Sequence, residues 1–100
     1  MPNLLVGTIT AIAPSNTLVL SSSDTIIAAN TDRIGLVLTN ISSSTMYLGL
    51  NGFYAVLNKG IVLTPNGGVW TMDDYNFTND KISGIANTTN SIIAIQEFIR

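Results

Sequence analysis

The sequence contains no cysteine and no histidine among its 100 residues. Without cysteine, disulfides and cysteine-ligated zinc are excluded. Without histidine, the chain lacks the side chain used most often for general acid–base catalysis, and serine–histidine nucleophile pairs are excluded as well. No glycine-rich phosphate-binding motif occurs. We therefore expect that the protein is not an enzyme and that it binds no cofactor.

Charge is also scarce. Charged residues make up 10% of the chain, against about 25% in an ordinary soluble domain. Four ranges contain none at all: 1–23, 34–58, 60–72 and 82–96. The surface must then consist mostly of serine, threonine, asparagine and aliphatic carbon, a composition that suits burial against other subunits because interface cores are depleted in charge.

Two classes of partner are disfavoured by the same counts. Four dispersed lysine and arginine residues cannot replace the counterions of a nucleic acid, which requires clustered basic side chains. No apolar run approaches the roughly 20 residues of a membrane-spanning helix. We expect neither nucleic acid nor membrane as a partner.

The length predicts one domain, and the pattern of short apolar runs predicts an all-β fold. Turn-forming residues separate runs rich in isoleucine, valine, leucine, threonine and tyrosine, which is typical of a single compact β-sandwich, jelly-roll-like or immunoglobulin-like. No stretch has a convincing helical spacing, and residues 73–79 could form one helical turn at most. The expected strands are Leu4–Ile12, Thr17–Ser21, Thr25–Ala29, Arg33–Asn40, Thr45–Leu50, Gly60–Leu63, Gly68–Met72, Lys81–Asn87 and Ser91–Phe98.

Alternation within the strands predicts which side chains form the core. In Arg33–Asn40, the set Ile34, Leu36 and Leu38 faces one way. The last strand is apolar on both faces, which indicates a sheet covered on both sides. Arg33 has two interpretations: it anchors its strand by pairing with Asp32 or a backbone carbonyl, or it is a solvated surface arginine.

Residues 1–13 form an apolar N-terminal segment ahead of a sandwich domain at 14–100. The segment has no charge, and the strands carry few of the lysines and prolines that normally protect sheet edges. It is interpreted either as an arm that covers an edge of a neighbouring chain or as the first strand of the sandwich. The candidate interface residues of the whole chain are Leu4, Leu5, Val6, Ile9, Ile12, Phe53, Tyr54, Trp70 and Tyr75.

Two other sequence patterns are weaker indications of a binding site. Asp74, Asn76, Thr78 and Asp80 place oxygen donors at every second position, as at the start of a calcium loop. Asn79 stands where such loops need glycine, and Ile85 stands where they need glutamate, so we expect a polar turn and no metal site. The aromatic residues could stack on sugars, but aromatic side chains more often fill a core or an interface.

The stretch from Ile26 to Glu97 resembles a group of small phage virion proteins. The resemblance rests on a short series of motifs in order: residues 27–33 (IAANTDR), 36–40 (LVLTN), 46–49 (MYLG), 60–63 (GIVL), 66–68 (NGG) and a hydrophobic closing strand. The segment Leu4–Ala13 is additional to the family's scheme, and Pro65-Asn66 replaces its commoner Pro-Gly. The resemblance implies a compact β-sandwich that decorates or cements a capsid, often as a trimer, or that belongs to a fibre.

The leading hypothesis is therefore a non-enzymatic capsid decoration (cement) protein. It would be a homotrimer on the outer capsid surface of the virion, bound to the major capsid protein. One alternative is a receptor- or carbohydrate-binding module of a phage fibre that uses Tyr54, Trp70 and Tyr75. The other is a tail or neck structural protein of the same fold.

Overall fold

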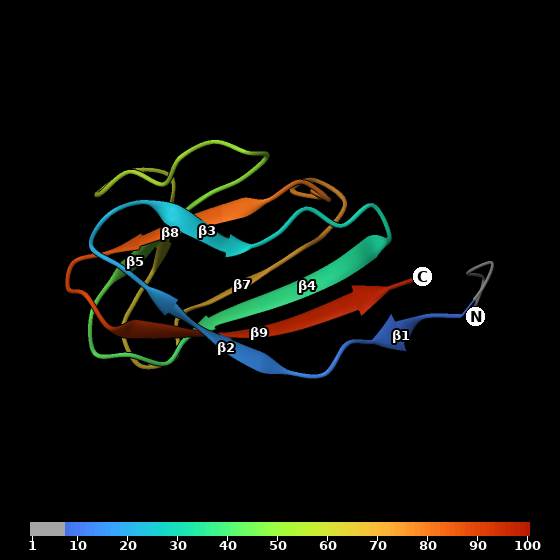
Figure 1. The fold of residues 1–100 in the computed structure, drawn as a ribbon, viewed down its shortest axis with the longest axis horizontal. Coiled ribbons are helices and arrows are strands. Elements are labelled where there is room, and N and C mark those ends of the chain that lie inside the picture. Colours follow the sequence, from blue (N-terminus) through green and yellow to red (C-terminus); the bar gives the residue numbers. More distant parts are fainter. Residues whose placement is uncertain (1–7) are drawn as a thin grey trace.

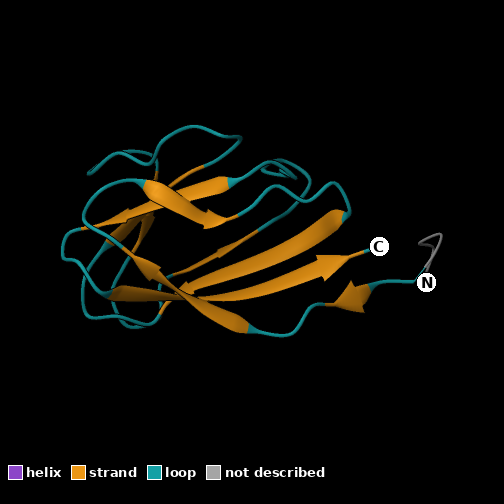
Figure 2. Ribbon diagram, in the orientation of Figure 1, coloured by secondary structure: helices purple, strands orange, loops and turns teal. Residues whose placement is uncertain are grey.

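A computed structural model describes residues 8–100, and in that range the regular elements are all β-strands, with no helix (Figure 2). The expected all-β fold is confirmed. From β2 onward the strands lie within two residues of their expected ends. Their bounds are β1 Thr10–Ala11, β2 Ser15–Val19, β3 Asp24–Ile27, β4 Arg33–Asn40, β5 Met46–Gly49, β6 Ile61–Leu63, β7 Val69–Thr71, β8 Ile82–Ala86 and β9 Ser91–Ile99.

The strands form two antiparallel sheets (Figure 1). Sheet A has the order β2-β9-β4-β7, with β1 also paired to β9, and sheet B has the order β3-β8-β5-β6. The pairing is nested: β2 with β9, β3 with β8, β4 with β7, and β5 with β6. Apart from β1, the two sheets have four strands each, and this connectivity makes a jelly roll, so the structure selects the first of the two expected sandwich types.

The core lies between the two sheets and follows the expected alternation. Leu38 of β4 is paired with Ile95 of β9, and both are buried together with Leu36 and Ile93. From sheet B the inward set is Ile26, Met46, Leu48, Leu63, Ile82 and Ala86. Because successive side chains of a strand point to opposite faces, the residues between these positions must point away from the core.

At the start of β4 the structure corrects the expected core. The register between β4 and β9 shifts between Arg33 and Gly35, as at a β-bulge. This shift turns Arg33 inward, where its side chain is buried, and leaves Ile34 only half-buried. The interpretation of Arg33 as a solvated surface residue is wrong. The expected anchoring by backbone carbonyls is correct, although its charged partner is Glu97 rather than Asp32.

The sequence predicts that the sheet of the last strand is covered on both faces, and within the described part of the chain it is covered on one face only. Ile92, Ala94 and Phe98 are exposed or half-buried on the outer side of β9. The physical reason is that the other sheet packs on the inner face, and the described residues supply no further layer outside sheet A.

Candidate functional site

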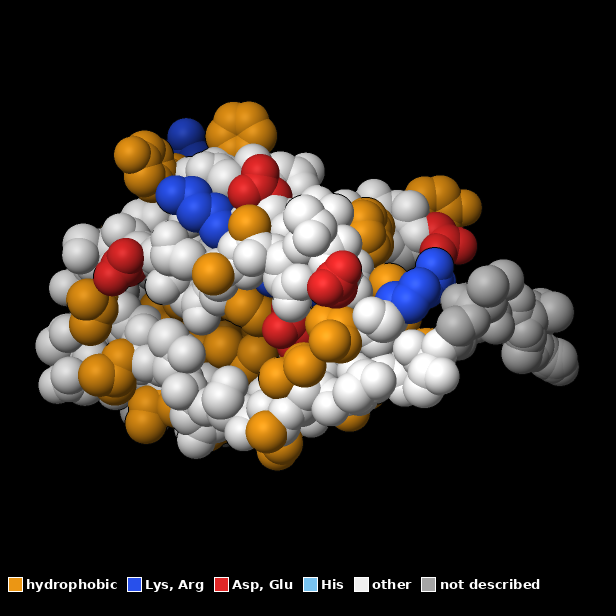
Figure 3. All heavy atoms as spheres, turned by 45° about the vertical axis from the view of Figure 1, so that its right-hand side comes forward, with side chains coloured by type: hydrophobic (Ala, Val, Ile, Leu, Met, Phe, Trp, Pro, Cys, Tyr) orange, Lys and Arg blue, Asp and Glu red, His pale blue; other side chains and the backbone are white. Residues whose placement is uncertain are grey.

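The outer face of sheet A is a continuous surface without charge, called here the neutral face. Its members are matched across the sheet by the strand register, which pairs Asn16 and Thr39 with Ala94, and Leu18 with Ile92. The residues counted in the neutral face are Asn16, Leu18, Val37, Thr39, Val69, Thr71, Ile92, Ala94 and Gln96, and the same side continues through Gly35 and Phe98 toward β1. In Figure 3 the lower part of the molecule, where β2 and β9 lie in Figure 1, is correspondingly orange and white, with no charged side chain.

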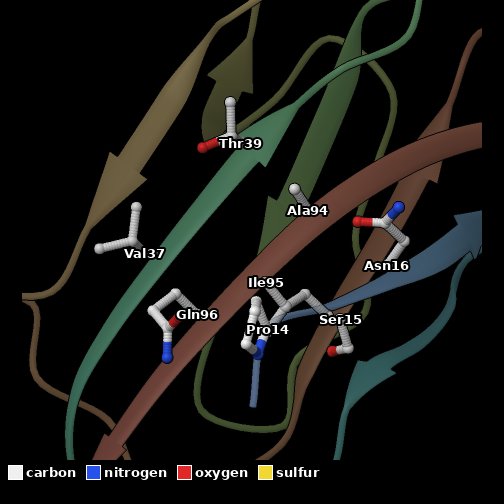
Figure 4. A pocket seen from close by; sticks show the side chains of 8 residues that line it. All are labelled: Pro14, Ser15, Asn16, Val37, Thr39, Ala94, Ile95 and Gln96. Atoms are coloured by element: carbon white, nitrogen blue, oxygen red, sulfur yellow. The ribbon is translucent and has the colours of Figure 1, made fainter. Parts of the chain in front are cut away.

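An open depression of about 380 Å³ is hollowed into the neutral face. Its floor is β9 and β4, which contribute the short side chains Val37, Thr39 and Ala94, and its wall is formed where the chain enters β2 (Figure 4). The lining is completed by Pro14, Ser15, Asn16, Ile95 and Gln96. No ionisable group lines it, so the depression suits an apolar or neutral hydrogen-bonding group.

A second apolar surface lies on the loop between β5 and β6, called here the aromatic loop (residues 50–60). Ala55 of this loop packs against Tyr47 and Ile85, which point outward from sheet B. A Cβ atom at Gly49 would come within 2.5 Å of the Phe53 carbonyl oxygen, so the loop approaches the sheet closely. The aromatic loop therefore covers the outer face of sheet B.

Hydrogen bonds anchor the aromatic loop at several points. Asn51 and Gly52 both have positive φ, and the Phe53 N–H donates to the Leu50 carbonyl over 3.0 Å, which makes a tight turn. The Ala55 N–H donates to Ser23 Oγ over 2.9 Å. At the far end, the Tyr47 hydroxyl donates to Asn58 Oδ1 over 3.1 Å. A loop anchored at these points presents its side chains with little ordering cost on binding.

The aromatic residues fall into three different environments. Phe53 and Tyr54 are adjacent in the aromatic loop and are 75% and 77% exposed. Tyr75 is 98% exposed in the separate loop between β7 and β8. Trp70 is 7% exposed in the core, so it cannot stack on a sugar or lie at an interface, and its place in the candidate interface set is wrong.

The remaining candidate interface residues belong to the N-terminal segment. Ile9 and Ile12 are exposed beside β1, which pairs with the end of β9 at Thr10–Ile99 and Ala11–Phe98. Leu4, Leu5 and Val6 lie outside the described residues. In the described part, the expected strand 4–12 is reduced to two paired residues, and their side chains are exposed and add nothing to the core.

Three of the four side chains in the calcium-like pattern use an oxygen to accept a hydrogen bond within or beside their own loop. Thr78 is buried, and its Oγ1 accepts from the Asp80 N–H. Asn76 Oδ1 accepts from the Asp73 N–H, and Asp80 Oδ1 accepts from the Lys81 N–H. Within residues 8–100, no group of three or more histidine, cysteine, aspartate or glutamate side chains is gathered for a metal ion. The same residues contain no helix long and apolar enough to cross a membrane.

The depression and the partner of Arg33 could not be predicted from the sequence. Both depend on residues far apart in the chain, such as Asn16, Thr39 and Ala94, that only strand pairing brings together. The adjacent Phe53 and Tyr54, in contrast, were recognisable from an uncharged stretch that follows an Asn-Gly turn signal.

Comparisons with known proteins add little. No family model matches the chain, and no curated protein matches it. Among solved structures, a chain from a study of Bacillus endospore appendages, described there as a family of disulfide-linked pili, aligns with a TM-score of 0.48 and 12% identity. The alignment covers 99% of this chain and 96% of that chain. A similarity at this level carries no conclusion about function.

Proposed function

We propose that the protein is a non-enzymatic virion structural protein of a phage. In this proposal it is a capsid decoration protein that forms a homotrimer and binds the major capsid protein on the outer surface of the head. The observation that carries the proposal is the neutral face, an uncharged sheet surface that no other described part of the chain covers. The assignment to a phage virion is based on the resemblance of residues 26–97 to small phage virion proteins.

The composition of this surface favours burial against protein. Apolar side chains such as Leu18 and Val69 are more than half exposed on the neutral face. Contiguous exposed apolar patches usually mark interaction sites, and the absence of charge removes the desolvation cost of burying ions. A decoration protein requires such a surface and requires no catalytic group.

The N-terminal segment supports attachment to a second partner. Ile9 and Ile12 are exposed beside β1, at the end of the molecule where the C-terminus also lies (Figure 1). An exposed apolar segment at one end leaves the broad faces of the sandwich for contacts between copies. We assign residues 1–13 to contact with the capsid shell and the broad faces to self-association.

The proposal is tested by locating the protein on particles. Heads and tails of purified virions are separated and analysed by mass spectrometry, and intact virions are labelled with gold-conjugated antibodies. Regular labelling of the outer head surface is the expected result. Recovery with tails or neck only would favour the alternative tail or neck role, and absence from particles would refute a virion role.

A fibre module that binds a receptor or carbohydrate is the second candidate, and the exposed pair Phe53 and Tyr54 favours it. The sequence predicts Tyr54, Trp70 and Tyr75 for this role. Trp70 is buried and Tyr75 lies on another loop, so neither adds to the surface formed by Phe53 and Tyr54. Binding of the isolated protein to a glycan array, abolished by Tyr54→Ala, would support this candidate over the first.

A further inference from the structure

We propose that copies of this chain associate head to tail, with Phe53 and Tyr54 of one copy seated in the depression of the neutral face of the next. The inference deepens the proposed function and rests on the self-association it includes. The occupant of the depression is thus a second copy of the same chain, and the contact joins two different surfaces of the molecule.

The two surfaces are compatible in size. The aromatic loop projects two adjacent aromatic side chains that contact little of their own chain, since both are about three-quarters exposed. The depression has a volume of about 380 Å³, equal to roughly a dozen water molecules at liquid density. Its floor carries only short side chains at Thr39, Ala94 and Val37. Aromatic anchors that fill pockets near the centre of an interface commonly supply most of its binding energy.

The two surfaces also match in polarity. No ionisable group lines the depression, so an aromatic ring can enter it without stripping water from a charge. Asn16, Thr39 and Gln96 offer neutral polar groups at its border, and the hydroxyl of Tyr54 can hydrogen-bond to such groups. Tyrosine is enriched in interfaces because it combines an apolar ring with a polar end.

The two surfaces lie on different sides of the molecule, which makes the contact heterologous. The aromatic loop covers the outer side of sheet B, and the neutral face is the outer side of sheet A, so they lie on opposite faces of the sandwich. Figure 1 shows the loop after β5 at the top and β2 and β9 at the bottom. A contact between two different surfaces is heterologous, and it produces a ring where the rotation closes and an open stack where it does not.

The extent of the neutral face sets the strength expected for the contact. Strand spacing and strand length give it an area of roughly 300–500 Å², which is below the approximately 800 Å² per partner of a standard stable interface. The contact is therefore expected to be weak in solution. It would be strengthened where a capsid holds copies close together, because attachment raises their effective concentration.

The test uses two variants of the full chain that each lose one of the two surfaces. Phe53→Ser/Tyr54→Ser removes the projecting aromatic side chains and keeps the depression. Ala94→Arg fills the depression and keeps the aromatic loop. If Ala94→Arg does not fold, Thr39→Arg replaces it as the variant that fills the depression. Tyr75→Ser is the matched control, because Tyr75 is a more exposed aromatic residue outside both surfaces. Circular dichroism and melting temperature verify that each variant is folded.

Sedimentation is measured from roughly 10 µM to 1 mM, a range that resolves weak association. We expect the wild type and Tyr75→Ser to associate alike, and each surface variant alone to associate at least about 25-fold more weakly. An equimolar mixture of the two surface variants should form a heterodimer that grows no further, since it retains one intact contact. Monomeric wild type, unimpaired variants, or a mixture that stays monomeric would overturn the inference.

The same measurement separates this inference from the proposed function. A wild-type assembly other than a trimer contradicts the proposed trimer and leaves the head-to-tail contact intact, provided the mixture still forms its heterodimer. Absence of the protein from virions refutes the capsid role alone. A closed dimer of wild type, with no growth beyond two copies, overturns both the head-to-tail contact and the proposed trimer, and the location of the protein on virions then decides the capsid role separately.

Discussion

Arg33 on β4 and Glu97 on β9 form an ion pair, with 2.8 Å between Nε and Oε2 and the arginine side chain fully buried. The other guanidinium N–H groups donate to three backbone carbonyls, those of Ala28, Thr78 and Asp80. One side chain thus ties β9 to the loop before β4 and to the loop before β8. Charge-assisted bonds of this kind are stronger than neutral ones, so the pair closes this end of the sandwich.

Arg33→Met is expected to lower the free energy of unfolding by about 3–5 kcal/mol, because it removes the charged partner of Glu97, which keeps only the Asn30 amide at 3.4 Å, and leaves three carbonyls without the arginine donor. Urea unfolding followed by tryptophan fluorescence measures the effect. Lys59→Met, at an exposed position, is the control and should change stability by less than about 0.5 kcal/mol. Equal midpoints for the two variants would contradict the structural role of Arg33.

Asn40→Ala is expected to destabilise the fold by about 1–3 kcal/mol. The buried amide of Asn40 donates to the carbonyls of Leu63 and Ser44, and its oxygen accepts from the Ser42 N–H. Removing it leaves buried groups unpaired. Thermal unfolding compares this variant with Asn87→Ala, which alters an exposed asparagine; a similar melting temperature for both would show that the network is dispensable.

Gly49→Ala is expected to displace the aromatic loop. Its Cβ atom would lie 2.5 Å from the Phe53 carbonyl oxygen and 2.7 Å from the Tyr54 backbone, and neither can yield without moving the loop. We expect a loss of about 1–3 kcal/mol and faster hydrogen exchange at the Ala55 amide. Gly35→Ala meets only the Phe98 side chain, at 3.2 Å, and should have a smaller effect. Unchanged exchange at Ala55 in Gly49→Ala would refute the close packing.

Deletion of residues 1–13 tests the assignment of the N-terminal segment. The described part of the segment adds two exposed residues to the edge of sheet A, so we expect the melting temperature to fall by no more than about 5 °C. Each buried leucine or isoleucine contributes roughly 1.5–3 kcal/mol at an interface, so retention on particles should fall by more than about 100-fold. A chain that unfolds on truncation would show that the segment is an integral strand, and unchanged retention would show that it is dispensable.

The strands could be predicted from the sequence because their signals are local. The Arg33–Asn40 strand has its expected bounds. Alternating apolar residues indicate a strand, and turn residues on either side indicate where it begins and ends, so both signals can be recognised within a few residues of sequence. The exposed Phe53 and Tyr54 were recognisable for a similar reason, as they follow an Asn-Gly turn in an uncharged stretch.

Tertiary structure alone decided which strands are neighbours and which faces remain open. A register shift beside Gly35 brings Arg33 to Glu97 across 64 residues of sequence, and the depression exists because β2, β9 and β4 lie side by side. Trp70 became a core residue because β7 joined the edge of sheet A with that side chain inward. The backbone conformation that a segment prefers depends on adjacent residues. The face of the sheet to which a side chain points depends on long-range strand pairing, which no local pattern specifies.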